Sequence, residues 1–251
     1  VRAALVRALR DPDGLVREAA AAALAPAAPA ERAALAALLS DPLAAVRGSA
    51  ARSLAGLAAE LEPAQRAAYE RARDERLAAL RLGSDTADGG LALGTALEDF
   101  GDLAGARAAY ERALAVDPRH SAVALNLGLV CAKLGDREAA RVALAQSIGA
   151  DANSAAPYLA LGLWWAEAGN HAQAEGLLAR AVQLEPGLPR ARYNLALLYW
   201  QTARPALAEP LLRAEWSERP TREVRDALAL LLEQTNRAAE GAALRAVQLE
   251  R

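Results

Sequence analysis

The sequence predicts an all-α protein, a right-handed solenoid built of helical hairpins, on two observations. Alanine makes up about a quarter of the 251 residues, far above its ordinary usage, and aromatic residues make up only 4%. This composition favours helices and disfavours sheets. Two internal periods, of about 30 and then about 34 residues, also run along the chain, and such periods are typical of stacked helical pairs.

The shorter period covers residues 1–57. The recurring residues are Asp11, Pro12, Val16, Arg17, Ala20 and Leu24, and then Asp41, Pro42, Val46, Arg47, Ala50 and Leu54. We expect each unit to be a helix, an Asp-Pro turn and a second helix, with Asp as the cap and Pro in the first turn. Val, Ala and Leu, four residues apart, form a narrow apolar stripe. The pattern resembles HEAT repeats, in which a Val-Arg pair opens the second helix.

The longer period covers residues 87–222 in four units. The matching residues are Leu93-Gly94, Leu127-Gly128, Leu161-Gly162 and Leu195-Ala196, followed by Ala106, Ala140, Ala174 and Ala208. Gly101, Gly135 and Gly169 mark the turn between paired helices, where a glycine accepts a left-handed conformation, and Ala203 departs from this pattern. The four units are identified as tetratricopeptide repeats.

Two segments lie outside these arrays. Residues 58–86 have a helical pattern rich in Arg and Glu, with Pro63 at the start, and we expect a helical adaptor that couples the arrays. Residues 223–251 read as a degenerate fifth unit, and we expect a capping repeat that seals the end of the solenoid.

This order of repeats resembles the C-terminal region of bacterial multihaem c-type cytochromes. In that family the haems are attached upstream, at Cys-x-x-Cys-His motifs, and this sequence has no such motif. The resemblance therefore implies a periplasmic or extracellular scaffold whose c-type haem would lie only in a missing upstream region. The chain has no Met and Val1 lies within an expected helix, so we expect a fragment or a processed chain.

Charge and residue counts disfavour several classes of function. A net charge of −2 and a pI near 5.9 give no general attraction to nucleic acid. No run of about 18 uncharged apolar residues is present to span a membrane. With Cys131 as the only cysteine and His120 and His171 as the only histidines, we expect no metal site, no cofactor and no disulfide. We expect Cys131 to be buried like a small apolar residue, and we expect both histidines to be solvated residues in turns.

No group of residues has the spacing of a nucleophile, a base and an orienting partner, so we expect no catalytic residue and no enzyme. The candidate site is the inner face formed by the first helix of each tetratricopeptide unit. Its expected lining residues are Leu125, Leu129, Leu159, Leu163, Arg190, Tyr193, Leu197 and Trp200. They are spaced by three and four, so they share one side of each helix. The alternative is that these side chains pack within the solenoid.

The sequence therefore predicts a non-catalytic scaffold for protein–protein interaction, which docks a partner or a second copy of itself through this groove. The resemblance places it in an exported multihaem cytochrome. The alternative is a cytoplasmic adaptor that binds a peptide or a helix in the same groove.

Overall fold

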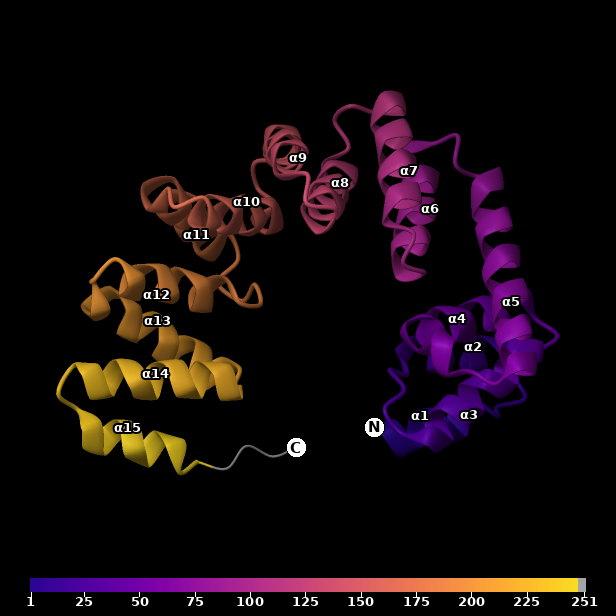
Figure 1. Cartoon of the computed structure of the whole chain (residues 1–251), viewed down its shortest axis with the longest axis horizontal. Helices are drawn as coiled ribbons and strands as arrows, with labels where there is room; N and C mark the ends of the chain where they lie inside the picture. Colours follow the sequence, from indigo (N-terminus) through magenta and orange to yellow (C-terminus); the bar gives the residue numbers. More distant parts are fainter. Residues whose placement is uncertain (248–251) are drawn as a thin grey trace. The chain divides into compact units, whose positions relative to one another are not determined.

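The protein is all-helical in the residues that the computed structural model describes, which are 1–247 (Figure 1). The chain divides into two compact units, Val1–Arg137 (unit 1) and Glu138–Arg251 (unit 2, described to residue 247). Successive helices pack against one another within each unit, and the predicted solenoid of helical hairpins is confirmed. The last residues of the expected capping repeat, 248–251, lie outside the described part.

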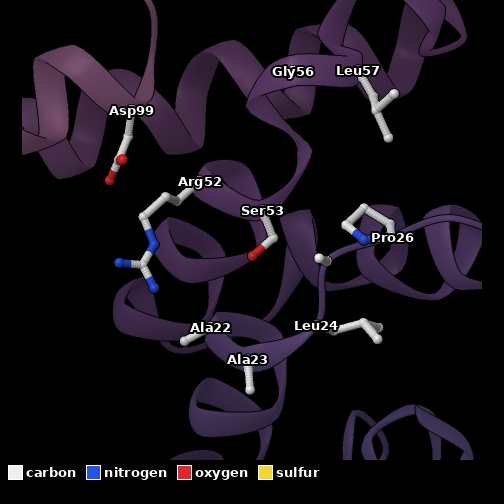
Figure 2. A pocket seen from close by; sticks show the side chains of 10 residues that line it. Ala22, Ala23, Leu24, Pro26, Arg52, Ser53, Gly56, Leu57 and Asp99 are labelled. Carbon is white, nitrogen blue, oxygen red and sulfur yellow. The ribbon is translucent and has the colours of Figure 1, made fainter. Parts of the chain in front are cut away.

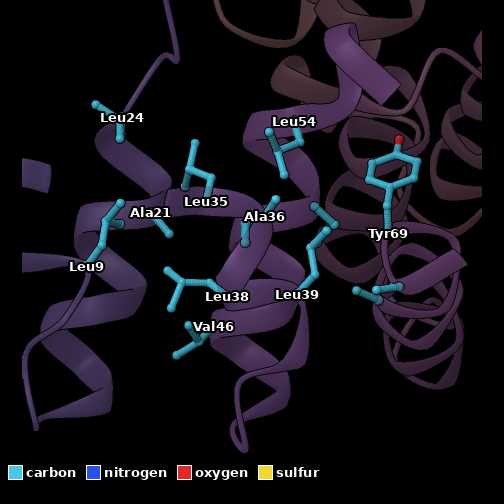
Figure 3. Close-up of a cluster of buried hydrophobic side chains, with 14 of the residues drawn as sticks. Leu9, Ala21, Leu24, Leu35, Ala36, Leu38, Leu39, Val46, Leu54 and Tyr69 are labelled. Carbon is cyan, nitrogen blue, oxygen red and sulfur yellow. The ribbon is translucent and has the colours of Figure 1, made fainter. Parts of the chain in front are cut away.

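Unit 1 begins with two helical pairs in the region of the shorter period. The elements are α1 (Arg2–Ala8), α2 (Gly14–Ala23), α3 (Pro29–Ala37), the 3₁₀ turn η1 (Leu38–Ser40), α4 (Ala44–Leu54) and the 3₁₀ turn η2 (Ala55–Glu60). Figure 3 shows the apolar core between them, in which Leu35, Val46 and Leu54 have no exposed surface. The predicted stripe is therefore buried in α4, whereas Val16 of α2 is 39% exposed.

The Asp-Pro turns differ from the prediction that Asp caps the second helix. Asp13, two residues after Asp11, is the N-cap of α2, and its side chain accepts a hydrogen bond from the Leu15 amide. Asp11 instead accepts from the Asp13 amide at 2.8 Å. Pro12 and Pro42 both lie just before their helices, because the first helical hydrogen bonds are accepted by the carbonyls of the next residues, Asp13 and Leu43, which are the N-caps.

One arginine in each pair joins successive helices. Arg17 donates through Nη1 to the backbone carbonyls of Asp11 and Pro12, at 2.8 and 3.0 Å. Its Nε and Nη2 donate to the two carboxylate oxygens of Asp41 in the next pair, at 2.7 and 3.1 Å. Arg47 repeats this arrangement, with bonds to the carbonyls of Asp41 and Pro42 and to the Glu75 carboxylate. The arginine of the repeated Val-Arg pair therefore has a structural role in both helical pairs.

Helix α5 (Pro63–Leu82) occupies the region of the predicted adaptor. Tyr69 and Ala72 pack in the same core as α1 to α4, whereas Leu77 packs in the next core, with α6 to α8. Tyr69 also meets Phe100 edge-to-face, with ring centroids 6.3 Å apart. A single uninterrupted helix thus contributes to two cores within unit 1.

Unit 1 continues with α6 (Ala87–Asp99), α7 (Leu103–Val116) and α8 (Ser121–Lys133). Gly94 of α6 faces the Tyr110 ring of α7, and an added Cβ would lie only 2.2 Å from that ring. Tyr110 is fully buried, and burial raises the pKa of its phenol to about 12. The small residue that the sequence places at each helix crossing therefore makes room for a large one.

Unit 2 contains the remaining helices. They are α9 (Arg137–Ala150), α10 (Ala155–Glu167), α11 (His171–Leu184), α12 (Ala191–Gln201), α13 (Pro205–Glu218), α14 (Arg222–Gln234) and α15 (Ala238–Arg245). At the crossing of α10 and α11, Gly162 lies against Leu178, which is fully buried. At the crossing of α12 and α13, Ala196 corresponds to Gly162 and Leu212 corresponds to Leu178. Both Ala196 and Leu212 are fully buried.

The turns within pairs have the left-handed backbone that the glycines predict. Gly101, Gly135 and Gly169 have φ of 83°, 80° and 78°. Ala203 stands at the next such turn and also has a positive φ, of 57°, although it carries a Cβ. Arg204, the following residue, makes two hydrogen bonds to the Glu175 carboxylate, at 3.1 and 2.7 Å. These contacts help to hold the turn in a conformation that costs a non-glycine residue energy.

Candidate partner-binding site

The expected lining residues fall in both units. Leu125 and Leu129 lie on α8 of unit 1, where Leu125 is half-buried and Leu129 is 39% exposed. Of the other six, five lie on α10 and α12 of unit 2, and Arg190 is the N-cap residue just before α12, so the site can be built from contacts in unit 2.

Leu159 and Leu163 of α10 lie one helical turn apart and are partly buried. Both pack against a core formed by Ala174, Leu178, Leu195 and Leu198. Trp165 joins the same core, and its ring meets that of Trp164 edge-to-face, with centroids 4.7 Å apart. The leucines are thus partly engaged by the neighbouring helices and leave part of their surface open.

Tyr193, Leu197 and Trp200 share one side of α12. All three are partly buried against a core that includes Leu228 and Leu231 of α14. The indole Nε1 of Trp200 donates a hydrogen bond to Gln234 Oε1 at 2.8 Å. This bond fixes the orientation of the Trp200 ring, so a partner would meet a preorganised aromatic surface.

Arg190 and Tyr193 also line a cavity of about 250 Å³. The cavity lies where α12 and α14 begin and α13 ends, and its lining residues are Pro189, Arg190, Tyr193, Glu215, Arg219, Thr221, Glu223 and Val224. Arg190 is exposed, and its backbone is left-handed, with φ of 68°. Strained residues of this kind cluster at functional sites. The structure therefore joins two of the predicted residues in one hollow.

The cavity also contains charged residues that were not among the predicted lining residues. Glu215 of α13 is only 3% exposed, and its Oε1 lies 3.4 Å from Nε of Arg219. At the N-terminus of α14, the pKa of Glu223 is lowered by hydrogen bonds from its own amide and from Thr221. In the sequence, Glu215 is marked only by being a charged residue within an apolar stripe. It lies on the second helix of a pair, whereas the predicted groove was built from first helices only.

A second hollow, of about 560 Å³, lies within unit 1 between α2, α4 and the end of α6 (Figure 2). Arg52 and Asp99 lie on the same side of it. Burial raises the pKa of Asp99, and the positive charge of Arg52 opposes this shift. Ser53 is engaged, since its hydroxyl donates to the Ala21 carbonyl at 2.6 Å. This hollow has no residue arrangement suited to nucleophilic attack.

The surroundings of Cys131 and His120 indicate structural roles for both side chains. Cys131 is 1% exposed, and burial raises the pKa of its thiol, which fits the predicted buried apolar residue. His120 is not simply solvated: its Nε2 lies 3.0 Å from Asp88, and its Nδ1 accepts from the Val123 amide at the start of α8. Among residues 1–247, no three His, Cys, Asp or Glu side chains are grouped as a metal site would need.

Comparisons with known proteins support the interpretation of the chain as a helical-repeat protein. Two tetratricopeptide-repeat family models match the chain, one at residues 91–155 and one at residues 166–231. The chain therefore carries tetratricopeptide repeats, as the 34-residue period predicts. No curated protein matches it. None of the described helices combines the length and the apolar character that crossing a membrane requires.

Several solved structures share the fold. MamA is 25% identical, with a TM-score of 0.56, over 61% of this chain and 90% of its own. PilF of Pseudomonas aeruginosa is 19% identical, with a TM-score of 0.62, over 79% of this chain and 90% of its own. YrrB, described as a TPR protein with an unusual peptide-binding site, is 16% identical, with a TM-score of 0.55, over 66% of this chain and 86% of its own.

Proposed function

We propose that the chain is a non-catalytic scaffold for protein–protein interaction and that it binds a segment of a partner protein through unit 2. Tetratricopeptide repeats support the scaffold role. The observation that carries the proposal is that Tyr193, Leu197 and Trp200 share one side of α12, next to the cavity that Arg190 and Tyr193 line. Partly exposed aromatic residues beside a hollow are the usual carriers of binding energy.

A peptide selection tests this proposal. A displayed library of random short peptides is selected on the full chain, and the affinities of the selected peptides are measured by calorimetry. Tyr193→Ala and Trp200→Ala should each weaken binding about fivefold or more, because each removes an aromatic contact. The melting temperature is followed in parallel, since both side chains also pack against α14.

Leu207→Ala is the matched control. Leu207 lies on α13, is 48% exposed and is not part of the proposed face, so its truncation should leave the affinity unchanged. The proposal fails if the folded Tyr193 and Trp200 variants bind as tightly as the parent. Sedimentation of the full chain over a range of concentrations tests the other expected partner, a second copy of the chain.

The finer proposal is that this scaffold is the repeat module of an exported multihaem c-type cytochrome, in the periplasm or outside the cell. Its support is the order of the repeats, with the shorter period preceding the tetratricopeptide units. The repeated arginine contacts of Arg17 and Arg47 support the HEAT-like interpretation of the first 57 residues. Reading the gene upstream of Val1 for an export signal and Cys-x-x-Cys-His motifs tests it. Their absence would favour a cytoplasmic peptide-binding adaptor instead.

A further inference from the structure

The cavity between α12, α13 and α14 has room for a side chain from a partner. Its volume is about 250 Å³, and the Tyr193 ring and the Val224 side chain contribute apolar surface to its lining. Arg190 lies at the exposed edge, and Glu215 is buried. A partner segment crossing this end of α12 could therefore place one side chain into unit 2.

Two of the lining residues each have a polar atom that is buried without a hydrogen-bond partner. One is Oε2 of Glu215, an acceptor, and the other is Nε of Arg219, a donor. They belong to side chains one helical turn apart, whose Oε1 and Nε atoms are 3.4 Å from each other. Unpaired buried groups of this kind are costly and are usually satisfied when a ligand or another group reaches them.

The charge of Glu215, in contrast, is already balanced. Arg219 lies on one side of it, and the pKa of the largely buried Arg192 is raised first by its hydrogen bond with Glu218 and further by the charge of Glu215. Arg192 in turn lies 2.8 Å from Glu218. A cationic group entering the cavity would meet Arg190 and Arg219, and an anionic group would meet Glu215 and Glu223. The cavity therefore offers hydrogen bonds to a neutral group, since burying a further charge would cost desolvation without a free counter-charge.

A primary carboxamide matches the unpaired atoms. Its NH₂ can donate to Oε2 of Glu215, while its carbonyl accepts from Nε–H of Arg219. A backbone peptide group does not match, because the N–H and C=O of a trans peptide point in opposite directions. The side chain of Arg219 is 31% exposed, and its Nη2 donates to the Gly187 carbonyl at 2.7 Å, so entry requires this one side chain to move.

We propose that this cavity is a specificity pocket that accepts a glutamine side chain from the bound partner segment. The two methylene groups of glutamine would pack against Tyr193 and Val224, and its carboxamide would reach the Glu215–Arg219 pair. This inference rests on the proposed binding of a partner segment by unit 2.

The test uses the peptides selected on the full chain. We expect glutamine at one fixed position. In a synthetic peptide of the selected sequence, replacing this glutamine by glutamate or by lysine should weaken binding about tenfold, because each places a charge beside a like charge. Replacement by methionine, which keeps the length but not the polar atoms, should weaken binding about fivefold.

Glu215→Met removes the acceptor and keeps the length of the side chain. In this variant the preference for glutamine over methionine should fall to about twofold or less. Glu185→Met, at an exposed acid outside the cavity, is the control and should keep the full preference. If Glu215→Met does not fold, the substitutions in the peptide decide the question alone.

The outcomes separate this inference from the proposed function. Selected peptides that bind through Tyr193 and Trp200 but carry lysine, arginine or no preferred residue at this position would overturn the glutamine pocket and leave the proposed function standing. The same holds if the glutamine and methionine peptides bind equally well. If no peptide binds to unit 2, both proposals fail.

Discussion

The two kinds of helical pair in this chain are joined by different interactions. In the first 57 residues, successive pairs are joined by Arg17 and Asp41, whose side chains are only 14% and 5% exposed. In unit 2, the ion pair of Arg204 with Glu175 is more open, with side chains 38% and 32% exposed. There, the close contacts are apolar, such as that of Gly162 with Leu178.

This difference separates two ways of stacking alanine-rich helices. A buried ion pair fixes the geometry because its hydrogen bonds are directional, but it is costly when one partner is lost. A small residue beneath a leucine fixes the distance between helices, and it is sensitive to any added volume. Substitutions that remove charge should therefore act most on residues 1–57, and substitutions that add volume should act most at the helix crossings marked by Gly94 and Gly162.

The largest expected effect follows from added volume at Gly162. An added Cβ there would lie 2.9 Å from Leu178, so Gly162→Leu should lower the free energy of unfolding by about 3 kcal/mol through overpacking. All four tryptophans lie in unit 2, so the unfolding of this unit can be followed by tryptophan fluorescence in urea. Gly176→Ala is the control: nothing lies within 4 Å of its added Cβ, and it should stabilise by about 0.5–1 kcal/mol. Equal midpoints for parent and Gly162→Leu would mean that the assigned crossing is wrong.

The next effect concerns the ion pair of the first region. Arg17→Leu leaves the buried Asp41 without its partner and should destabilise by about 2 kcal/mol. Arg47→Leu is the matched control, because Arg47 makes the same two carbonyl contacts but pairs with Glu75, whose side chain is 45% exposed. Apart from the loss of the two carbonyl contacts, which both variants share, Arg47→Leu should lower the free energy of unfolding by under about 1 kcal/mol. The unfolding free energies of both variants are measured by circular dichroism of the full chain. A larger loss of stability for Arg47→Leu than for Arg17→Leu would contradict the proposed contrast.

A pH dependence should distinguish the Arg17–Asp41 pair from a packing effect. The hydrogen bond from Arg17 holds the pKa of Asp41 below its ordinary value of 3.8. A lowered pKa gives stability that is complete above the unfolded-state value and is lost as pH falls through the folded-state value. The difference in unfolding free energy between the parent and Arg17→Leu should thus be constant from pH 7 to 5 and should narrow below about pH 4. A difference that stays constant down to pH 2 would point to packing alone.

The smallest effect is expected at the rim of the cavity in unit 2. Arg190 has φ of 68°, which glycine adopts without steric cost, so Arg190→Gly should raise the free energy of unfolding by about 0.5 kcal/mol. Arg119→Gly, in a turn without a positive φ, should lower it by a similar amount. Tryptophan fluorescence measures the first variant and circular dichroism the second. If both variants lose stability equally, the backbone of Arg190 is not strained.

Much of the fold could be predicted because each repeat carries its own marks. Glycines in three turns predicted the left-handed backbone, and the crossing residues Gly94 and Gly162 predicted close helices. The helix starts in the first region were less accurate, because Asp11 and Asp13 are both good caps and only the backbone geometry decides between them.

The candidate site was predicted only in part. The spacing on first helices indicated Tyr193 and Trp200, since such spacing requires no tertiary information. It could not indicate Glu215, which lies on a second helix and enters the cavity only because α13 ends where α14 begins. Nor could it indicate the backbone of Arg190, because a positive φ is uncommon for arginine and no sequence signal accompanies it.

The ion pairs between successive helical pairs also limit how this sequence can change in length. Arg2 with Glu31, Arg47 with Glu75, Arg204 with Glu175 and Arg237 with Glu209 are separated by 29, 28, 29 and 28 residues. One residue inserted within a helix turns everything after it by about 100° and carries the acid away from its arginine. A whole helical pair can be added or removed with every other contact intact. Viable insertions and deletions in homologous chains should therefore come in complete pairs or fall within the turns.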